Sequence, residues 1–140
     1  MEILVIEDDL FFGVRIEKTL QRLGYGVRMA KSRDEALALA EAHRPALVIV
    51  NFGREPLDPP EVVRRIKALP HAPPVLGFIS HKWMPQVRPN AMAAGCDLLV
   101  ANSALSMRLP QLVAKLAPQD GSAVSVSEAA QMAEEEGDQV

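Results

Sequence analysis

The sequence predicts a single α/β domain with a doubly wound, five-stranded parallel sheet and helices on both of its faces. Short apolar, β-branched segments alternate with longer segments of helical periodicity, and this alternation occurs five times within residues 1–117. The connections between the segments are mostly of ordinary length. Right-handed crossovers between parallel strands then place helices on both faces of the sheet.

The first strand and helix follow from their residue types. Residues 2–6 are apolar and β-branched, as in a strand that is buried on both faces. Asp9 predicts the N-cap of a helix that runs to about Leu23, and Gly24 fits the position after its end. Residues 25–30 form a shorter alternating segment, which we expect at an edge of the sheet.

The second helix has a capping box, in which Ser32 caps the helix and Glu35 reaches back. It ends near His43, because Pro45 cannot continue it. Residues 46–50 form the third strand, which is strongly apolar.

Asp58 predicts the cap of a third helix, with Pro59 in its first turn and Glu61 as the return partner. The buried face of this helix is predicted to comprise Val62, Val63, Ile66 and Leu69. The remaining elements are a turn at 70–74, strands at 75–79 and 98–100, a helix over 85–94 that stops at Gly95, and a helix over 104–117 that is interrupted or begins again near Pro110.

The pattern fails after residue 117. Residues 119–127 are polar and rich in Gly and Ser, and residues 128–136 would form a short acidic helix with little apolar surface. We therefore expect a single folded α/β domain at 1–117, followed by a flexible acidic tail at 118–140.

The composition excludes several classes of protein. The net charge is −3, so electrostatic capture of nucleic acid is not expected. No apolar run approaches the roughly 18 residues of a membrane span. The single cysteine, Cys96, has no disulfide or metal-spaced partner. A cytoplasmic protein without nucleic acid or membrane partners is expected.

Polar side chains follow four of the predicted strands. They are Glu7 and Asp8 after the first strand, Asn51 after the third, Ser80 after the fourth and Asn102 after the fifth. In a doubly wound sheet, ligands bind outside the carboxyl ends of the strands. These ends are therefore the candidate functional site.

In this arrangement the chain resembles the receiver domain of two-component response regulators, a CheY-like, flavodoxin-like (βα)5 fold, over residues 1 to about 117. The resemblance rests on motifs that occur in the family's order, together with the helix start at Asp58. They are Ile-Leu-Val-Ile-Glu-Asp-Asp at 3–9, Pro-Ala-Leu-Val-Ile-Val-Asn at 45–51, Pro-Val-Leu-Gly-Phe-Ile-Ser at 74–80 and Ala-Gly-Cys-Asp-Leu-Leu-Val at 94–100.

The resemblance implies a role for each strand end. Receivers hold Mg²⁺ with an acidic pair after the first strand, which Glu7 and Asp8 fit. They carry a phospho-accepting Asp after the third strand, a Ser or Thr after the fourth, and a Lys followed by Pro after the fifth. Ser80 fits the hydroxyl position, although the register also allows Ile79.

Other positions depart from the family pattern. Asn51 occupies the phospho-acceptor position, Asn102 the Lys position and Ser103 the Pro position, and Leu99 stands where many receivers have an aromatic switch residue. A neutral amide is not a useful nucleophile toward phosphorus. The loss of the carboxylate also removes a negative metal ligand, so Mg²⁺ binding is expected to be weak or absent. The resemblance therefore predicts a pseudo-receiver that is not an enzyme, has no catalytic residue or required cofactor, and acts by binding proteins without phosphorylation.

Partners are expected to be signalling proteins, including a histidine kinase, with a possible homodimer through residues 85–117. Trp83 is either a partner contact or folds back over the adjacent helix. Of Phe11 and Phe12, one is expected to pack inward while the other edges the pocket.

Two alternatives remain open at the level of sequence. The first is an unconventional phospho-receiver that accepts phosphate at Asp8 or Asp9. The second is a small enzyme on a flavodoxin-like sheet, which is disfavoured because the sequence has no Gly-rich phosphate loop, catalytic Cys/His pair or metal cluster.

Overall fold

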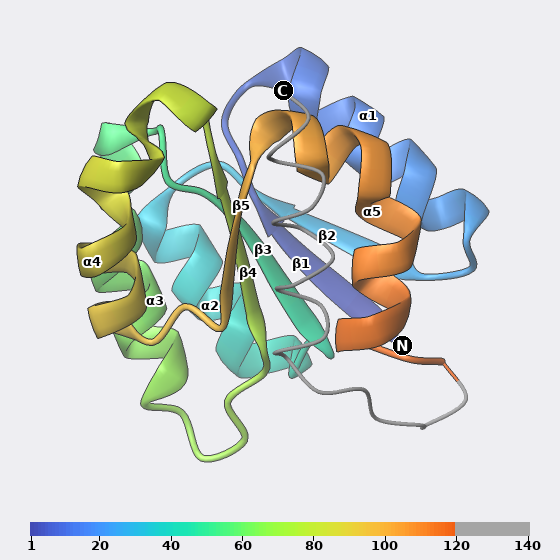
Figure 1. The fold of residues 1–140 in the computed structure, drawn as a ribbon. Coiled ribbons are helices and arrows are strands. Elements are labelled where there is room, and N and C mark those ends of the chain that lie inside the picture. Colours follow the sequence, from blue (N-terminus) through green and yellow to red (C-terminus); the bar gives the residue numbers. More distant parts are fainter. Residues whose placement is uncertain (120–140) are drawn as a thin grey trace.

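The computed structural model describes residues 1–119, and the acidic tail predicted for 118–140 lies outside this part from Asp120 onward. Within these residues, five strands and five α-helices alternate (Figure 1). The strands are β1 (Glu2–Ile6), β2 (Gly26–Ala30), β3 (Leu47–Asn51), β4 (Val75–Ile79) and β5 (Leu98–Ala101). The helices are α1 (Leu10–Arg22), α2 (Arg33–His43), α3 (Pro59–Lys67), α4 (Met84–Ala94) and α5 (Asn102–Leu116).

The strands form one parallel sheet in the order β2-β1-β3-β4-β5, which confirms the predicted doubly wound fold and the edge position of β2. β1 and β3 lie inside the sheet, and their apolar residues are almost completely buried. Because all strands run in one direction, their carboxyl ends meet at one edge of the sheet.

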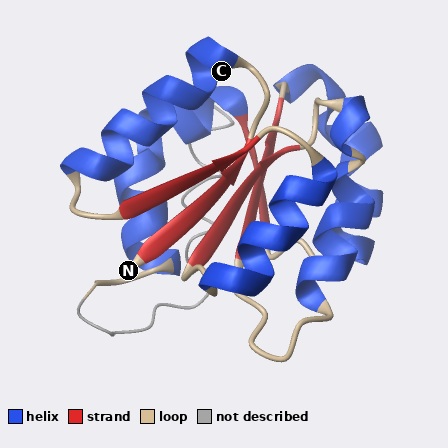
Figure 2. Cartoon of the chain, turned by 180° about the vertical axis from the view of Figure 1, so that it is seen from behind, coloured by secondary structure: helices blue, strands red, loops and turns tan. Residues whose placement is uncertain are grey.

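Helices cover both faces of this sheet (Figures 1 and 2). One core cluster joins α1 and α5 to one face, through residues such as Ile16, Leu20, Leu105 and Leu112. The other core cluster joins α2, α3 and α4 to the opposite face. The alternation of strand residues between the two clusters, as with Val48 and Ile49, follows from the two-residue period of a strand.

Most of the predicted helix ends are confirmed. The Asp9 carboxylate accepts a hydrogen bond from the Phe12 N–H at 2.9 Å and caps α1. The Ser32 hydroxyl accepts one from the Glu35 N–H at 3.2 Å, while the Glu35 carboxylate accepts one from the Lys31 N–H at 2.7 Å. Gly24 and Gly95 end α1 and α4 with φ of 95° and 109°, a conformation that favours glycine.

Two predictions about helices are wrong. Asp58 does not cap α3 with its side chain: its backbone is left-handed, with a φ of 47°, and its carboxylate instead accepts a hydrogen bond from Arg33 at 3.5 Å. Glu61 does not reach back, because it forms ion pairs with Arg64 and Arg65.

The break expected near Pro110 is also absent, since α5 runs without interruption from Asn102 to Leu116. Its leucines on either side of the proline are buried against the sheet. This packing outweighs the hydrogen bond that proline removes from the helix. Two short 3₁₀ segments, Glu55–Leu57 after β3 and His81–Trp83 after β4, were not predicted.

Two hydrogen bonds join the residues at the end of α5 to the connection between α1 and β2. The Tyr25 hydroxyl donates a buried hydrogen bond to the Ala117 carbonyl at 2.7 Å. The Gln119 amide donates another to the Leu23 carbonyl, also at 2.7 Å. Among the described residues, no helix has the length and apolar character needed to cross a membrane.

Candidate functional site

Glu7 lies at the end of β1 and is the charged residue in the core of the described part of the chain, with 1% of its surface exposed. One carboxylate oxygen accepts a hydrogen bond from the Asp9 N–H at 2.9 Å. The other accepts one from the side-chain amide of Asn51 at 2.7 Å. Both oxygens of this buried carboxylate are therefore satisfied within the protein.

Burial raises the pKa of Glu7 above its ordinary value of 4.5, and the neighbouring Asp8 charge acts in the same direction. The hydrogen bonds from Asp9 and Asn51, and the charge of Arg54, oppose this effect without cancelling it. Desolvation is therefore the dominant influence on this carboxyl group.

This shift predicts a pH dependence of stability. A carboxyl group whose pKa is raised by folding contributes most below its unfolded pKa, and that contribution is lost as the pH rises through the folded value. We expect wild type to lose stability relative to Glu7→Gln as the pH rises from about 4 to about 7 in urea unfolding.

Glu61→Gln is the control of opposite sign. The hydrogen bond from Arg65 lowers the pKa of Glu61, so its contribution is present above the unfolded pKa and is lost as the pH falls. A Glu7→Gln difference that stays constant with pH would contradict the assignment of a raised pKa to Glu7.

Asn51 ends β3 and is held at both ends of its side chain. Its Nδ2 donates to Glu7, and its Oδ1 accepts the Gly53 N–H at 2.7 Å. This pattern assigns the amide orientation, since only the nitrogen donates and only the oxygen accepts. The structure thus brings Glu7 and Asn51 into direct contact, as expected from their places at two adjacent strand ends.

Asp8 does not line the cavity and forms an ion pair with Arg54, whose guanidinium Nε donates to Asp8 Oδ1. The attraction raises the pKa of Arg54, with smaller contributions from Glu7 and Asp9. Sequence reasoning missed Arg54. The available signal was an arginine three residues after Asn51, in the connection that leaves the same edge of the sheet.

The site has a cavity of about 140 Å³, which the structure places at the carboxyl ends of the strands. Asn102, the first residue of α5, lines the cavity, whereas Ser80 does not. The described residues that line it are Glu7, Asp9, Phe12, Asn51, Arg54, Phe78 and Asn102. Ile79 pairs with Ala101, so Ser80 and Asn102 follow neighbouring strands at the same level.

At the start of α5, two polar atoms are buried without a hydrogen-bond partner among the described residues: Asn102 Oδ1 and Ser103 Oγ. Buried polar atoms are usually paired with protein or with water.

Leu99 is buried in the core against the α2–α4 face and therefore does not face solvent.

The aromatic side chains around the site divide into buried and exposed ones. Phe12 packs inward, stacks on Phe78 with ring centroids 5.2 Å apart, and also lines the cavity. Phe11 is 83% exposed, so Phe12 takes both of the roles that were expected of the pair. Trp83 is 51% exposed, and the Lys82 ammonium lies 5.3 Å from the centre of its ring.

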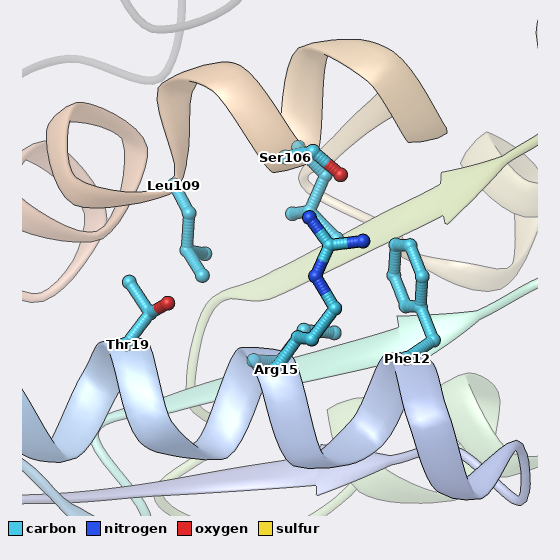
Figure 3. A pocket seen from close by; sticks show the side chains of 7 residues that line it. Phe12, Arg15, Thr19, Ser106 and Leu109 are labelled. Carbon is cyan, nitrogen blue, oxygen red and sulfur yellow. The ribbon is translucent and has the colours of Figure 1, made fainter.

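Phe12 also lines a second, smaller cavity of about 50 Å³ between α1 and α5 (Figure 3). Arg15 and Thr19 of α1 face Ser106 and Leu109 of α5 across it. One aromatic side chain, Phe12, therefore lines both the strand-end cavity and the cavity between α1 and α5.

The resemblance to receivers implies Mg²⁺ at the acidic pair, and the side chains do not fit that ion. Both Glu7 oxygens accept hydrogen bonds, and Asp8 is paired with Arg54. Asp9 is engaged as the cap of α1. Within residues 1–119, no group of three or more Asp, Glu, His or Cys residues is placed to hold a metal ion. The donor set is thus already used by protein groups.

The parallel five-stranded sheet and its polar strand ends define a class of signalling α/β domain. A model of the response regulator receiver domain matches residues 3–116, so the chain belongs to this family of two-component signalling domains. Receiver domains interact with histidine kinases or other proteins.

Among similar proteins, response regulator MprA of Mycolicibacterium vanbaalenii is 28% identical over 131 residues, which cover 91% of this chain and 56% of MprA. The chain thus spans about half the length of that relative.

Solved structures show the same fold. The Vibrio cholerae chemotaxis protein CheY4 superimposes with a TM-score of 0.74 at 20% identity, over 82% of this chain and 97% of CheY4. A response regulator from Burkholderia pseudomallei, solved with a phosphorylated aspartic acid, a calcium ion and citrate, has a TM-score of 0.70 at 25% identity. That match covers 96% of this chain and 74% of the other.

Proposed function

We propose that this chain is a phosphorylation-independent pseudo-receiver that binds protein partners in one fixed conformation. The supporting observation is the state of Asn51. Its amide occupies the end of β3 and is hydrogen-bonded to Glu7 on one side and to Gly53 on the other. An amide at this position is uncharged and lacks the anionic oxygen with which a carboxylate attacks phosphorus.

The fifth strand end supports the same proposal. Asn102 stands where the family pattern has a lysine, so no ammonium group is available there to neutralise a phosphoryl oxygen. Leu99, proposed to replace an aromatic switch residue, is buried, and a buried aliphatic side chain does not have the in-or-out positions of an exposed aromatic ring. The output surface is therefore proposed to be constant.

Incubation with acetyl phosphate and Mg²⁺, followed by intact-mass measurement, tests the proposal. The expected result is no acid-labile addition of about 80 Da, the mass of one phosphoryl group. Stoichiometric labelling of wild type would overturn it, and peptide mapping would then show whether Asp8 or Asp9 is the acceptor.

Both of these carboxylates are already engaged, Asp8 with Arg54 and Asp9 with the Phe12 N–H. The matched control is a receiver with an intact aspartate, treated in the same reaction. Its labelling shows that the conditions support phosphorylation.

A further inference from the structure

The pocket contains a cation that belongs to the protein itself. Arg54 lies in the connection between β3 and the 3₁₀ segment Glu55–Leu57, and its guanidinium contacts Asp8. Glu7 and Asp9 also lie near enough to act on it electrostatically. Three consecutive carboxylates after β1 therefore share one arginine side chain.

We propose that Arg54 is the resident cation of this pocket and replaces a divalent metal ion as the partner of its carboxylates. The proposal rests on the proposed phosphorylation-independent function and adds to it the reason why the site holds its shape without metal. The guanidinium neutralises Asp8, while the Asn51 amide satisfies Glu7.

The chemistry of arginine suits this role. Its guanidinium stays charged across the physiological pH range and presents several N–H donors to a carboxylate. Unlike Mg²⁺, it is covalently attached, so its local concentration does not depend on the metal content of the cell. The Arg54 side chain is 41% exposed and the Asp8 side chain 25% exposed, so the ion pair lies at the surface, where Arg54 lines the pocket.

One short segment supplies both the Asn51 amide and the Arg54 guanidinium. Asn51 and Arg54 are three residues apart, and the Gly53 N–H between them donates to the Asn51 side chain. The turn after β3 is thus tied to Glu7 at its start and to Asp8 at its end. Restoring a carboxylate at position 51 leaves the guanidinium in place, so it does not by itself restore a metal site.

Mg²⁺ titration by isothermal calorimetry tests this proposal on wild type, Asn51→Asp, Arg54→Ala and the double variant. We expect the double variant to bind Mg²⁺ about tenfold or more tightly than Asn51→Asp alone, because removal of a nearby positive charge favours a cation. A Mg²⁺-dependent rise in Tm should accompany this gain, since a ligand that binds the folded state stabilises it.

Arg64→Ala in the Asn51→Asp background is the matched control, because Arg64 is paired with Glu61 on the surface of α3. This control is expected to leave Mg²⁺ affinity unchanged. Equal affinities of Asn51→Asp and the double variant would overturn the proposal, as would tight Mg²⁺ binding by wild type. Arg54→Met keeps the aliphatic stem of the side chain and replaces Arg54→Ala if circular dichroism shows that the alanine variant is unfolded.

The two proposals fail in different ways. Phosphorylation of wild type by acetyl phosphate overturns the proposed function, whatever the effect of Arg54 on metal affinity. Equal Mg²⁺ affinities with and without Arg54 overturn only the role of the arginine.

Discussion

Replacement of Gly77 by alanine is expected to lower the free energy of unfolding by about 3 kcal/mol, at the upper end of the usual cost of overpacking. A Cβ at this position would lie 2.5 Å from Cε2 and 2.7 Å from Cδ2 of Phe52, and 3.0 Å from Sγ of Cys96. Gly77 is in β4 and pairs with β3 on one side and β5 on the other, so its backbone has no room to retreat.

Urea unfolding measures this effect, with Gly26→Ala as the control. Gly26 is also in a strand, but its new Cβ would meet only the flexible Glu2 side chain, at 3.3 Å. We expect Phe52→Leu to recover part of the loss when combined with Gly77→Ala, because it removes the ring atoms that clash. If Gly77→Ala were as stable as Gly26→Ala, the close approach of the Phe52 ring to β4 would be wrong.

Asn51→Ala is expected to lower the free energy of unfolding by about 2–3 kcal/mol at pH 7, the range for hydrogen bonds to charged or buried groups. The variant removes the donor that Glu7 uses and the acceptor that the Gly53 N–H uses. The loss should shrink at acid pH, because protonation of Glu7 removes the buried charge that the amide stabilises.

Asn90→Ala is the control, since Asn90 is exposed on α4 and the change favours helix. Both variants are compared with wild type by urea unfolding at about pH 4 and pH 7. A cost for Asn51→Ala equal to that for Asn90→Ala at both pH values would show that the Glu7–Asn51 contact contributes nothing to stability.

The sequence was sufficient to predict the fold because its signals are local. Apolar strands, the Asp9 and Ser32 caps and the glycines at 24 and 95 each act within a few residues of themselves. Asp58 and Pro110 show where this reasoning ends. The Asp58 side chain is drawn to Arg33, which is 25 residues away, and packing against the sheet decides the path of α5 through Pro110.

The candidate site was predictable only in part. The strand ends indicated that Glu7 and Asn51 converge, because parallel strands place their ends at one edge. The Asp8–Arg54 pair was not predictable, since a connecting segment has no periodicity that fixes the direction of its side chains. The family roles of Ser80 and Asn102 stay predictions, and the structure places only Asn102 at the cavity.

The hydrogen bond between Tyr25 and Ala117 joins residues that are 92 positions apart. It attaches the end of α5 on the face of the sheet that α1 and α5 cover, whereas helices from the middle of the chain cover the other face. During synthesis from the N-terminus, every element of the α2–α4 face is therefore made while the opposite face still lacks α5. Among the described helices α5 is synthesised last, and it packs against β4, β5 and α1, so the apolar side chains of β4 and β5 on that face are the last to be covered.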